Sequence, residues 1–285
     1  MKNIDIMGRY IWQLRDEMEL TYISKRGLTT TEALLNKGIL WGEAPFTTAL
    51  VHHGRIVFEK SHLERLRKTI DYLYGERREV LAHMSAAMRE MGDQLSEHPY
   101  VYLRATLFEL GSGELEFILW AVVRDMPTES LAMTLVQDAP CIHTPNYIKR
   151  SDYSFKFRNR NKLRRQGIDD AIYFDSQNRV LDSSTGNLFF VKGDKIIYSE
   201  YIPGVLEGVL RENLIECMNR KGHELEQRII LKDELPSFDE IWVSNAFVGL
   251  QRVSKLDEIE YKREYFDIIE EQLNKYCGDI WPRKN

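Results

Sequence analysis

The stretch Ile148-Lys149-Arg150-Ser151-Asp152-Tyr153, together with Asp182-Ser183-Ser184-Thr185-Gly186-Asn187-Leu188-Phe189-Phe190, decides how the whole chain is interpreted. Between the two segments we expect a helix near residues 154–166 and then a strand, a turn and a strand over residues 171–182. Helices and strands continue to alternate after this stretch. The second half of the chain is therefore typical of an α/β domain.

The first half of the chain predicts an α+β arrangement. Ser61 and Glu64 form a capping-box pattern at the start of an amphipathic helix, and Gly75 ends that helix. The other expected elements of this half are a hairpin over residues 46–51 and 55–59, a helix near 78–91, and strands near 101–108 and 115–123. In the second half we further expect strands near 186–191, 195–198 and 240–244, and helices near 205–221 and 264–276.

These elements divide the chain into two domains. We predict a small N-terminal α+β domain at residues 1–126 and a large C-terminal domain at residues 146–285. Residues 127–145 contain one more strand and then a segment bounded by Pro140 and Pro145. This segment is the predicted interdomain linker region.

The composition excludes several classes of protein. The net charge of −5 does not suit a chain built to bind polyanions. The longest apolar run, residues 117–123, is too short to span a membrane, and the first residues lack the apolar run of a signal peptide. Cys141, Cys217 and Cys277 are far apart and form no metal or redox motif, which suits a reducing compartment. We expect a cytoplasmic protein that binds no metal, membrane or nucleic acid.

One basic run leaves an alternative open. Its members crowd the helix expected near residues 154–166, and they are Lys156, Arg158, Arg160, Lys162, Arg164 and Arg165. Such a run can bind nucleic acid. However, only Phe157 is interleaved with it and the chain as a whole is acidic, so we favour a solvated helix face.

Four blocks, taken in order, resemble the class IV aminotransferases, which include branched-chain aminotransferases, D-amino acid aminotransferases and aminodeoxychorismate lyases. They are Phe46-Thr47-Thr48, the His-x-x-Arg-Leu motif in Ser61-His62-Leu63-Glu64-Arg65-Leu66, the stretch from Lys149 to Asn187, and Val205-Leu206-Glu207-Gly208-Val209-Leu210-Arg211. The resemblance implies the two-domain fold type IV, with a smaller α+β domain and a larger, barrel-like α/β domain. It also implies a pyridoxal 5′-phosphate cofactor and a homodimer.

The resemblance assigns roles to particular residues. Lys149 is implied to be the catalytic lysine that binds the cofactor and moves a proton, with Tyr153 near the cofactor's phenolic oxygen and Asp182 at its ring nitrogen. The cofactor phosphate is implied to contact Arg65, Gly208, Val209, Leu210, Ser244, Asn245 and Ala246. Lys156 is an alternative to Lys149, because Lys-Phe-Arg-Asn-Arg resembles a motif of the lyase branch. We favour Lys149, because starting from Lys156 would delete about two turns of the intervening helix.

Four positions depart from the family pattern. Asp182 stands where relatives usually have glutamate, and Leu210 and Ala246 stand where many relatives bind phosphate with threonines. We expect Ser244 or Asn245 to compensate. Leu50 replaces an arginine often found after the Phe46 segment.

The substrate is implied by two further similarities. Tyr102 and Arg104 resemble the Tyr-Ile-Arg strand of branched-chain aminotransferases, whereas Phe46 and Thr48 lie in a segment closer to the lyase branch. The resemblance therefore implies transamination between a branched-chain-like amino acid and a 2-oxo acid. The alternatives are a lyase that releases pyruvate from 4-amino-4-deoxychorismate and a homologue that binds a small ligand without catalysis.

Overall fold

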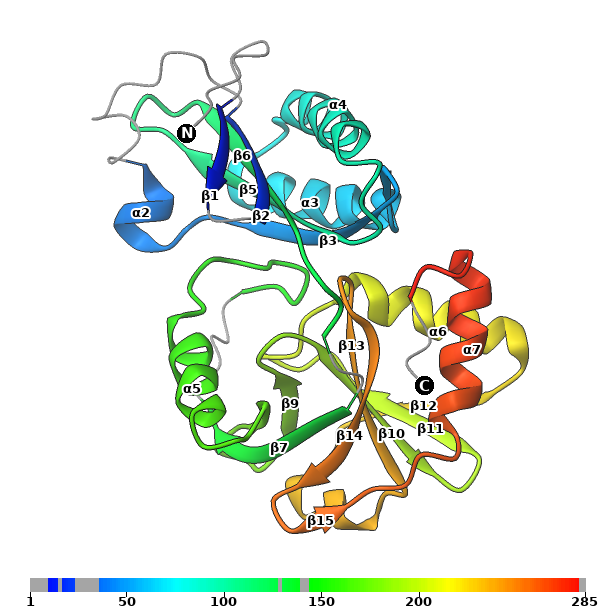
Figure 1. Ribbon diagram of the computed structural model, residues 1–285. Coiled ribbons are helices and arrows are strands. Elements are labelled where there is room, and N and C mark those ends of the chain that lie inside the picture. Colours follow the sequence, from blue (N-terminus) through cyan, green and yellow to red (C-terminus); the bar gives the residue numbers. More distant parts are fainter. Residues whose placement is uncertain (1–9, 15–16, 24–35, 128–129, 139–143, 282–285) are drawn as a thin grey trace. The chain divides into compact units, whose positions relative to one another are not determined.

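The computed structural model describes residues 10–14, 17–23, 36–127, 130–138 and 144–281 (Figure 1). Contacts divide the chain into two compact units. Unit 1 is Met1–Met126 with Tyr147–Tyr153, and unit 2 is Pro127–Asn146 with Ser154–Asn285. The short segment that carries Lys149 thus packs with the first unit, whereas the sequence predicts it in the C-terminal domain.

The predicted linker region is only partly a connection. Most of its described residues form β7 (Ser130–Gln137), a strand of the sheet in unit 2. Residues 139–143, which include Pro140 and Cys141, lie outside the described residues.

Unit 1 is an antiparallel sheet covered by helices. The strand order is β1-β2-β6-β5-β3-β4. The strands are β1 (Tyr10–Leu14), β2 (Glu17–Ile23), β3 (Phe46–His52), β4 (Arg55–Ile56), β5 (Val101–Glu109) and β6 (Leu115–Val123). The helices are α2 (Lys37–Trp41), α3 (Glu59–Tyr74) and α4 (Glu79–Gln94).

Strand β5 shows why the two faces of this sheet differ. Its residues alternate between buried and half-buried, as expected for a strand with one face on a core. One face of the strand packs on a core shared with α3 and α4, to which it contributes Val101, Leu103, Ala105 and Leu107. The other face carries Tyr102 and Arg104, so the predicted substrate residues lie away from this core.

The start of α3 differs from the sequence prediction. The helix begins at Glu59, after Phe58 in a left-handed conformation with φ 56°, and no side chain caps it. The predicted capping box of Ser61 and Glu64 is therefore wrong, because the chain enters the helix before Ser61. Glu64 instead pairs with Arg67 on the helix surface. Strand β4 correspondingly ends at Ile56 rather than at residue 59.

Unit 2 contains a nine-stranded mixed sheet that curls into a half-barrel. Eight strands follow the order β12-β11-β10-β13-β14-β7-β8-β9, and β15 pairs with β14. Besides β7, the strands are β8 (Asp170–Phe174), β9 (Val180–Ser183), β10 (Asn187–Lys192), β11 (Lys195–Ser199), β12 (Glu224–Arg228), β13 (Glu240–Asn245), β14 (Gly249–Leu256) and β15 (Ile259–Glu260).

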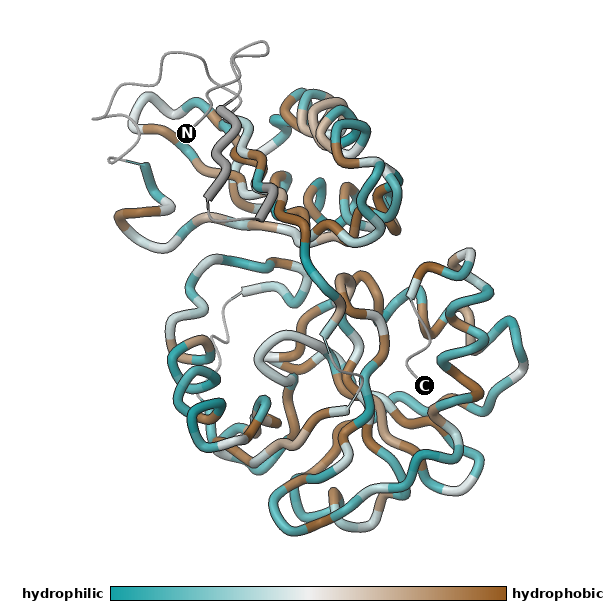
Figure 2. Tube along the Cα trace, in the orientation of Figure 1, coloured by the Kyte–Doolittle hydropathy of each residue, from teal (hydrophilic) through white to brown (hydrophobic). Residues whose placement is uncertain are grey.

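Three helices and one 3₁₀ turn complete unit 2. They are α5 (Ser154–Arg164), α6 (Val209–Lys221), η1 (Lys232–Ser237) and α7 (Phe266–Cys277). Helix α5 contacts β8, and it is mostly hydrophilic in Figure 2, whereas the strands of the sheet are largely hydrophobic. Within the described part of the chain, no helix has both the length and the apolar character needed to cross a membrane.

Candidate active site

Lys149 is held against the beginning of β3. Its carbonyl oxygen accepts a hydrogen bond of 2.8 Å from the backbone N–H of Phe46, and the neighbouring Arg150 forms a β-bridge with Pro45. The side-chain nitrogen donates to the hydroxyl of Tyr153 at 3.1 Å and lies 5.1 Å from the centroid of the Phe46 ring. The structure thus brings the predicted reactive lysine and its predicted tyrosine together in one segment.

Arg65 of α3 belongs to a buried polar chain in the same unit. Its Nη2 donates to Thr47 Oγ1 at 2.8 Å, and that oxygen lies 2.6 Å from Nδ1 of the buried His62. The Thr47 hydroxyl can donate to Nδ1 of the imidazole or accept from it, because its oxygen keeps a second acceptor position beside the bond from Arg65. Among the described residues, nothing hydrogen-bonds this buried Nε2.

The charge state of His62 follows from this setting. Burial, followed by the positive charges of Arg65 and Lys149, lowers the pKa of His62 to about 3. The imidazole therefore stays neutral near pH 7. His62 and Thr47 lie within the motifs that resemble the family, but the sequence predicts no role for either residue. A motif gives the order of residues and not their contacts.

Arg104 lies on the sheet face away from the helical core. Its guanidinium carbon is 3.6 Å from the Phe46 ring centroid, and the group donates to the hydroxyls of Ser151 and Thr106 at 2.9 and 3.1 Å. Thr48 is its cross-strand neighbour on β3. Burial lowers the pKa of Arg104, and Tyr102 opposes this shift. No carboxylate among the described residues pairs with Arg104, so this partly desolvated cation is suited to bind an anion.

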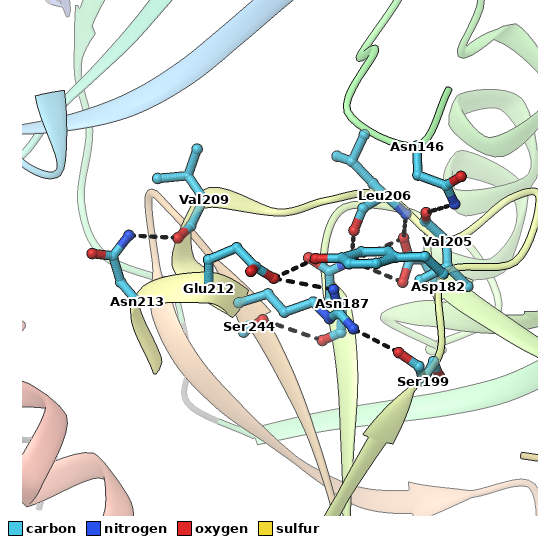
Figure 3. Close-up of polar contacts among 12 residues, drawn as sticks. Asn146, Asp182, Asn187, Ser199, Val205, Leu206, Val209, Glu212, Asn213 and Ser244 are labelled. Atoms are coloured by element: carbon cyan, nitrogen blue, oxygen red, sulfur yellow. Dashed lines mark hydrogen bonds and ion pairs between the residues drawn. The ribbon is translucent and has the colours of Figure 1, made fainter. Parts of the chain in front are cut away.

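In unit 2, Asp182 is the centre of a second cluster (Figure 3). Its Oδ2 accepts a hydrogen bond of 2.7 Å from the backbone N–H of Leu206. The amide nitrogen of Asn187 donates to Oδ1 and Oδ2 at 3.0 and 3.1 Å, and also to the carbonyl oxygen of Leu206 at 2.7 Å. Asn187 thus joins β9, β10 and the loop before α6. Asn146 binds this loop too, since its amide nitrogen donates to the carbonyl oxygen of Val205.

The hydrogen bonds of Asp182 leave room for one more donor. An ionised carboxylate offers about four acceptor positions. The contacts with Asn187 and Leu206 use three of them within the described residues, and the remaining position is on Oδ1. Burial raises the pKa of Asp182, and the charge of Lys156 is the first influence that opposes this rise. This arrangement suits the N–H of a cofactor ring.

The N-terminus of α6 offers a place for a phosphate group. Gly208 is the N-cap residue and provides no side-chain cap. The first N–H groups of a helix, here those of Val209 and Leu210, have no partner within the helix and favour anions. A Cβ atom at Gly208 would lie 1.8 Å from Asn187 Oδ1, so this position needs glycine for space.

Ser244, Asn245 and Ala246 lie at the end of β13. The hydroxyl of Ser244 points to the carbonyl oxygen of Asn187, with a long separation of 3.5 Å. The Asn245 amide donates to the carbonyl oxygen of Thr185 at 2.6 Å, and its oxygen accepts from the N–H of Phe247. Both side chains expected to replace the missing threonines therefore make contacts within the protein.

Lys156 occupies a different environment from Lys149. Its side-chain nitrogen is 3.7 Å from Asp138 Oδ2 and 4.7 Å from the centroid of the Tyr173 ring. It belongs to the unit that contains Asp182, whereas Lys149 has the tyrosine hydroxyl implied for the reactive lysine. The assignment of Lys149 stays a prediction.

The family model "Amino-transferase class IV" matches residues 44–256. The chain belongs to the class IV aminotransferases. A probable branched-chain-amino-acid aminotransferase of Rickettsia bellii is 21% identical over 266 residues, which cover 87% of this chain and 91% of the relative. The predicted family is confirmed.

Solved structures of other proteins have the same fold. A putative 4-amino-4-deoxychorismate lyase from Legionella pneumophila matches with a TM-score of 0.77 at 18% identity, covering 88% of this chain and 97% of the other. A hypothetical aminotransferase from Mycobacterium tuberculosis, in a pyridoxal-phosphate-bound form, matches with a TM-score of 0.73 at 16% identity, covering 89% and 95%. The predicted fold type IV is confirmed, and the Mycobacterium structure contains bound pyridoxal phosphate.

Proposed function

We propose that this class IV member catalyses pyridoxal-phosphate-dependent transamination between an amino acid and a 2-oxo acid, with Lys149 as its catalytic residue. The observation that carries the proposal is the hydrogen bond of 3.1 Å between Lys149 Nζ and the Tyr153 hydroxyl, in the same unit as the buried cation Arg65. Bound pyridoxal phosphate supplies an aldehyde that captures amino groups and a ring that accepts electrons.

Two groups of residues would hold the cofactor. Arg65 and the N–H groups at the start of α6 suit its phosphate, because one provides a buried guanidinium and the other an uncapped helix N-terminus. The remaining acceptor position of Asp182 suits the ring N–H.

The protein's own groups would then move the proton. Tyr153 would orient the amine of Lys149, and this amine would move a proton between the substrate α-carbon and the cofactor. Arg104 and Tyr102 bind a substrate carboxylate, since the described partners of Arg104 are hydroxyls and the Phe46 ring. The similarity to the Rickettsia relative supports a branched-chain-like amino donor.

A spectrum and a trapping experiment test this proposal. We would record the absorbance of the purified protein with pyridoxal phosphate, reduce it with borohydride and identify the labelled peptide by mass spectrometry. A label on Lys149, and its absence in Lys149→Ala, are expected. Amino acids would then be tested for amino-group transfer to 2-oxoglutarate. A protein that shows no band and takes up no label is the non-catalytic homologue.

The second candidate is a lyase that releases pyruvate from 4-amino-4-deoxychorismate. It is favoured by Phe46-Thr47-Thr48, which resembles the lyase branch, and by the Legionella neighbour. Both reactions use the same lysine, so labelling does not separate them. Pyruvate release from that substrate, without any 2-oxo acid acceptor, would identify the lyase.

We also propose that the enzyme is a homodimer, because two-fold symmetric dimers are the commonest assemblies of soluble enzymes. Sedimentation of the full chain over a range of concentrations tests this, and a mass of one chain throughout contradicts it.

A further inference from the structure

The basic run of α5 has two faces. Arg158, Lys162, Arg164 and Arg165 are exposed, as expected for a solvated surface. Lys156, Asn159, Arg160 and Leu163 recur at helical spacing, and each is buried or half-buried. Lys156 and Arg160 therefore point toward the rest of unit 2 rather than toward solvent. The prediction of a solvated helix face did not separate these two cations from the exposed ones.

The inward cations meet acids of the sheet. Arg160 Nε lies 3.7 Å from the buried Asp170, and Lys156 Nζ lies 3.7 Å from Asp138. Only 19% of the Lys156 side chain is exposed, which is low for a lysine. The side chain also lies over the Tyr173 ring.

Tyr173 connects Lys156 to the strand that carries Asp182. The Tyr173 hydroxyl is 3.2 Å from Ser184 Oγ, and β8 pairs with β9 through Ile172 and Ser183. The ring under the ammonium therefore belongs to the strand next to Asp182. None of the family blocks assigns a role to a lysine at this position on the helix once Lys149 is the reactive residue.

We propose that Lys156 is a positioning residue for Asp182: its ammonium group balances the buried carboxylate and sets how firmly that carboxylate holds the cofactor's ring proton. The proposal deepens the function proposed above and rests on it for the role of Asp182. Lys156 itself touches neither cofactor nor substrate in this assignment.

The charges around Asp182 support this role. Burial raises the pKa of Asp182, and the influences that oppose it are, in order, Lys156, the N–H of Leu206, Asn187 and Arg211. Lys156 in turn faces Asp138 and the Tyr173 ring, so its charge acts on Asp138 as well as on Asp182. Loss of the Lys156 charge makes the buried carboxylate of Asp182 more costly, and this favours the protonated form of Asp182.

The first test measures the energetic coupling between Lys156 and Asp182 in the protein without cofactor. Urea unfolding of the full chain would be compared for wild type, Lys156→Gln, Lys156→Arg, Asp182→Asn and the Lys156→Gln/Asp182→Asn double variant. At pH 7 we expect Lys156→Gln to raise the unfolding equilibrium constant roughly tenfold more in the wild-type background than in the Asp182→Asn background. Lys156→Arg keeps the charge and should retain most of the stability.

The pH dependence has a definite sign. The folded-state pKa of Asp182 is raised, so burying its carboxylate costs stability above the unfolded-state pKa of about 3.9, and this cost disappears in more acidic solution. Lys156→Gln enlarges the cost, and its effect should therefore shrink toward pH 4. If Lys156→Gln lowered stability equally in the wild-type and Asp182→Asn backgrounds, Lys156 would interact with Asp138 but not with Asp182. This result would overturn the proposal.

The second test follows the loaded protein. The pH titration of cofactor absorbance should shift to higher pH in Lys156→Gln and stay near wild type in Lys156→Arg, whereas a purely structural lysine would leave it unchanged. A borohydride label found on Lys156 instead of Lys149 overturns the positioning role. If wild type takes up no cofactor, the proposed function fails, while the unfolding cycle still decides whether Lys156 and Asp182 are coupled.

Discussion

Gly208→Ala is the most direct test of the Asp182 cluster. The added Cβ would lie 1.8 Å from Asn187 Oδ1 and 3.0 Å from its Cγ, well inside contact distance. Asn187 has a short side chain, and its amide nitrogen is fixed by both oxygens of Asp182 and by the carbonyl oxygen of Leu206. The methyl group therefore displaces the amide and breaks these bonds.

The expected magnitude follows from what is lost. A hydrogen bond to a charged group contributes about 1.5–3 kcal/mol, and alanine returns about 0.4–1 kcal/mol by restricting the unfolded chain. Gly208 has φ −75°, which alanine adopts without strain, so no backbone penalty is added. We expect Gly208→Ala to lower the free energy of unfolding by about 1–2 kcal/mol.

Urea denaturation of a matched set of variants measures this. Asn187→Ala removes the amide and makes room for the methyl group, so Gly208→Ala should cost little in that background. Refutation would be a Gly208→Ala variant as stable as wild type, or one whose loss adds fully to that of Asn187→Ala. Either result would mean that Asn187 does not need the space at Gly208.

Three further predictions concern unit 1. Lys149→Ala should abolish amino-group transfer and borohydride labelling, whereas Lys149→Arg keeps the charge and should still show no labelling; mass spectrometry of the reduced protein decides both. Arg104→Met should raise the KM for the 2-oxo acid by about tenfold or more, with a smaller change in kcat, because a charge-assisted hydrogen bond contributes about 1.5–3 kcal/mol. Unchanged KM values would rule out carboxylate binding by Arg104. His62, whose folded-state pKa is lowered to about 3, takes up its proton more readily when unfolded. Wild type should therefore lose up to about 1.4 kcal/mol of unfolding free energy for each pH unit below about 6.5, and His62→Gln should lack this part of the slope in urea denaturation at a series of pH values.

Local patterns predicted the elements that form from neighbouring residues. The helices expected near residues 154–166, 205–221 and 264–276 correspond to α5, α6 and α7, because each combines helical spacing with a recognisable end. Strand β14 was missed, since its sequence, Gly249–Leu256, mixes charged, polar and apolar residues without a regular alternation. It becomes a strand by pairing with β13 on one side and β7 on the other.

The contacts of Lys149 show what local patterns leave out. The lysine was found from its order relative to Asp182, but its attachment to unit 1 depends on a backbone bond to Phe46, which is distant in the sequence. Asn187 was likewise quoted as part of a motif, whereas its function depends on Asp182 and Leu206, which the fold brings within 3.1 Å of its amide. Pairings between distant segments decide both cases, and no periodicity within one segment contains them.

The aspartate at position 182 and the lysine at position 156 are best understood together. Aspartate is one carbon shorter than the glutamate usual in relatives, so its carboxylate stays close to its own strand, within reach of Leu206 and Asn187. These neighbours are neutral donors, and they do not balance the charge of a carboxylate buried this completely. Cations from outside the strand, Lys156 of α5 and Arg211 of α6, oppose the rise in the pKa of Asp182 that burial causes. The shorter acid and the inward lysine thus form one electrostatic arrangement, in which a change at either position alters the other.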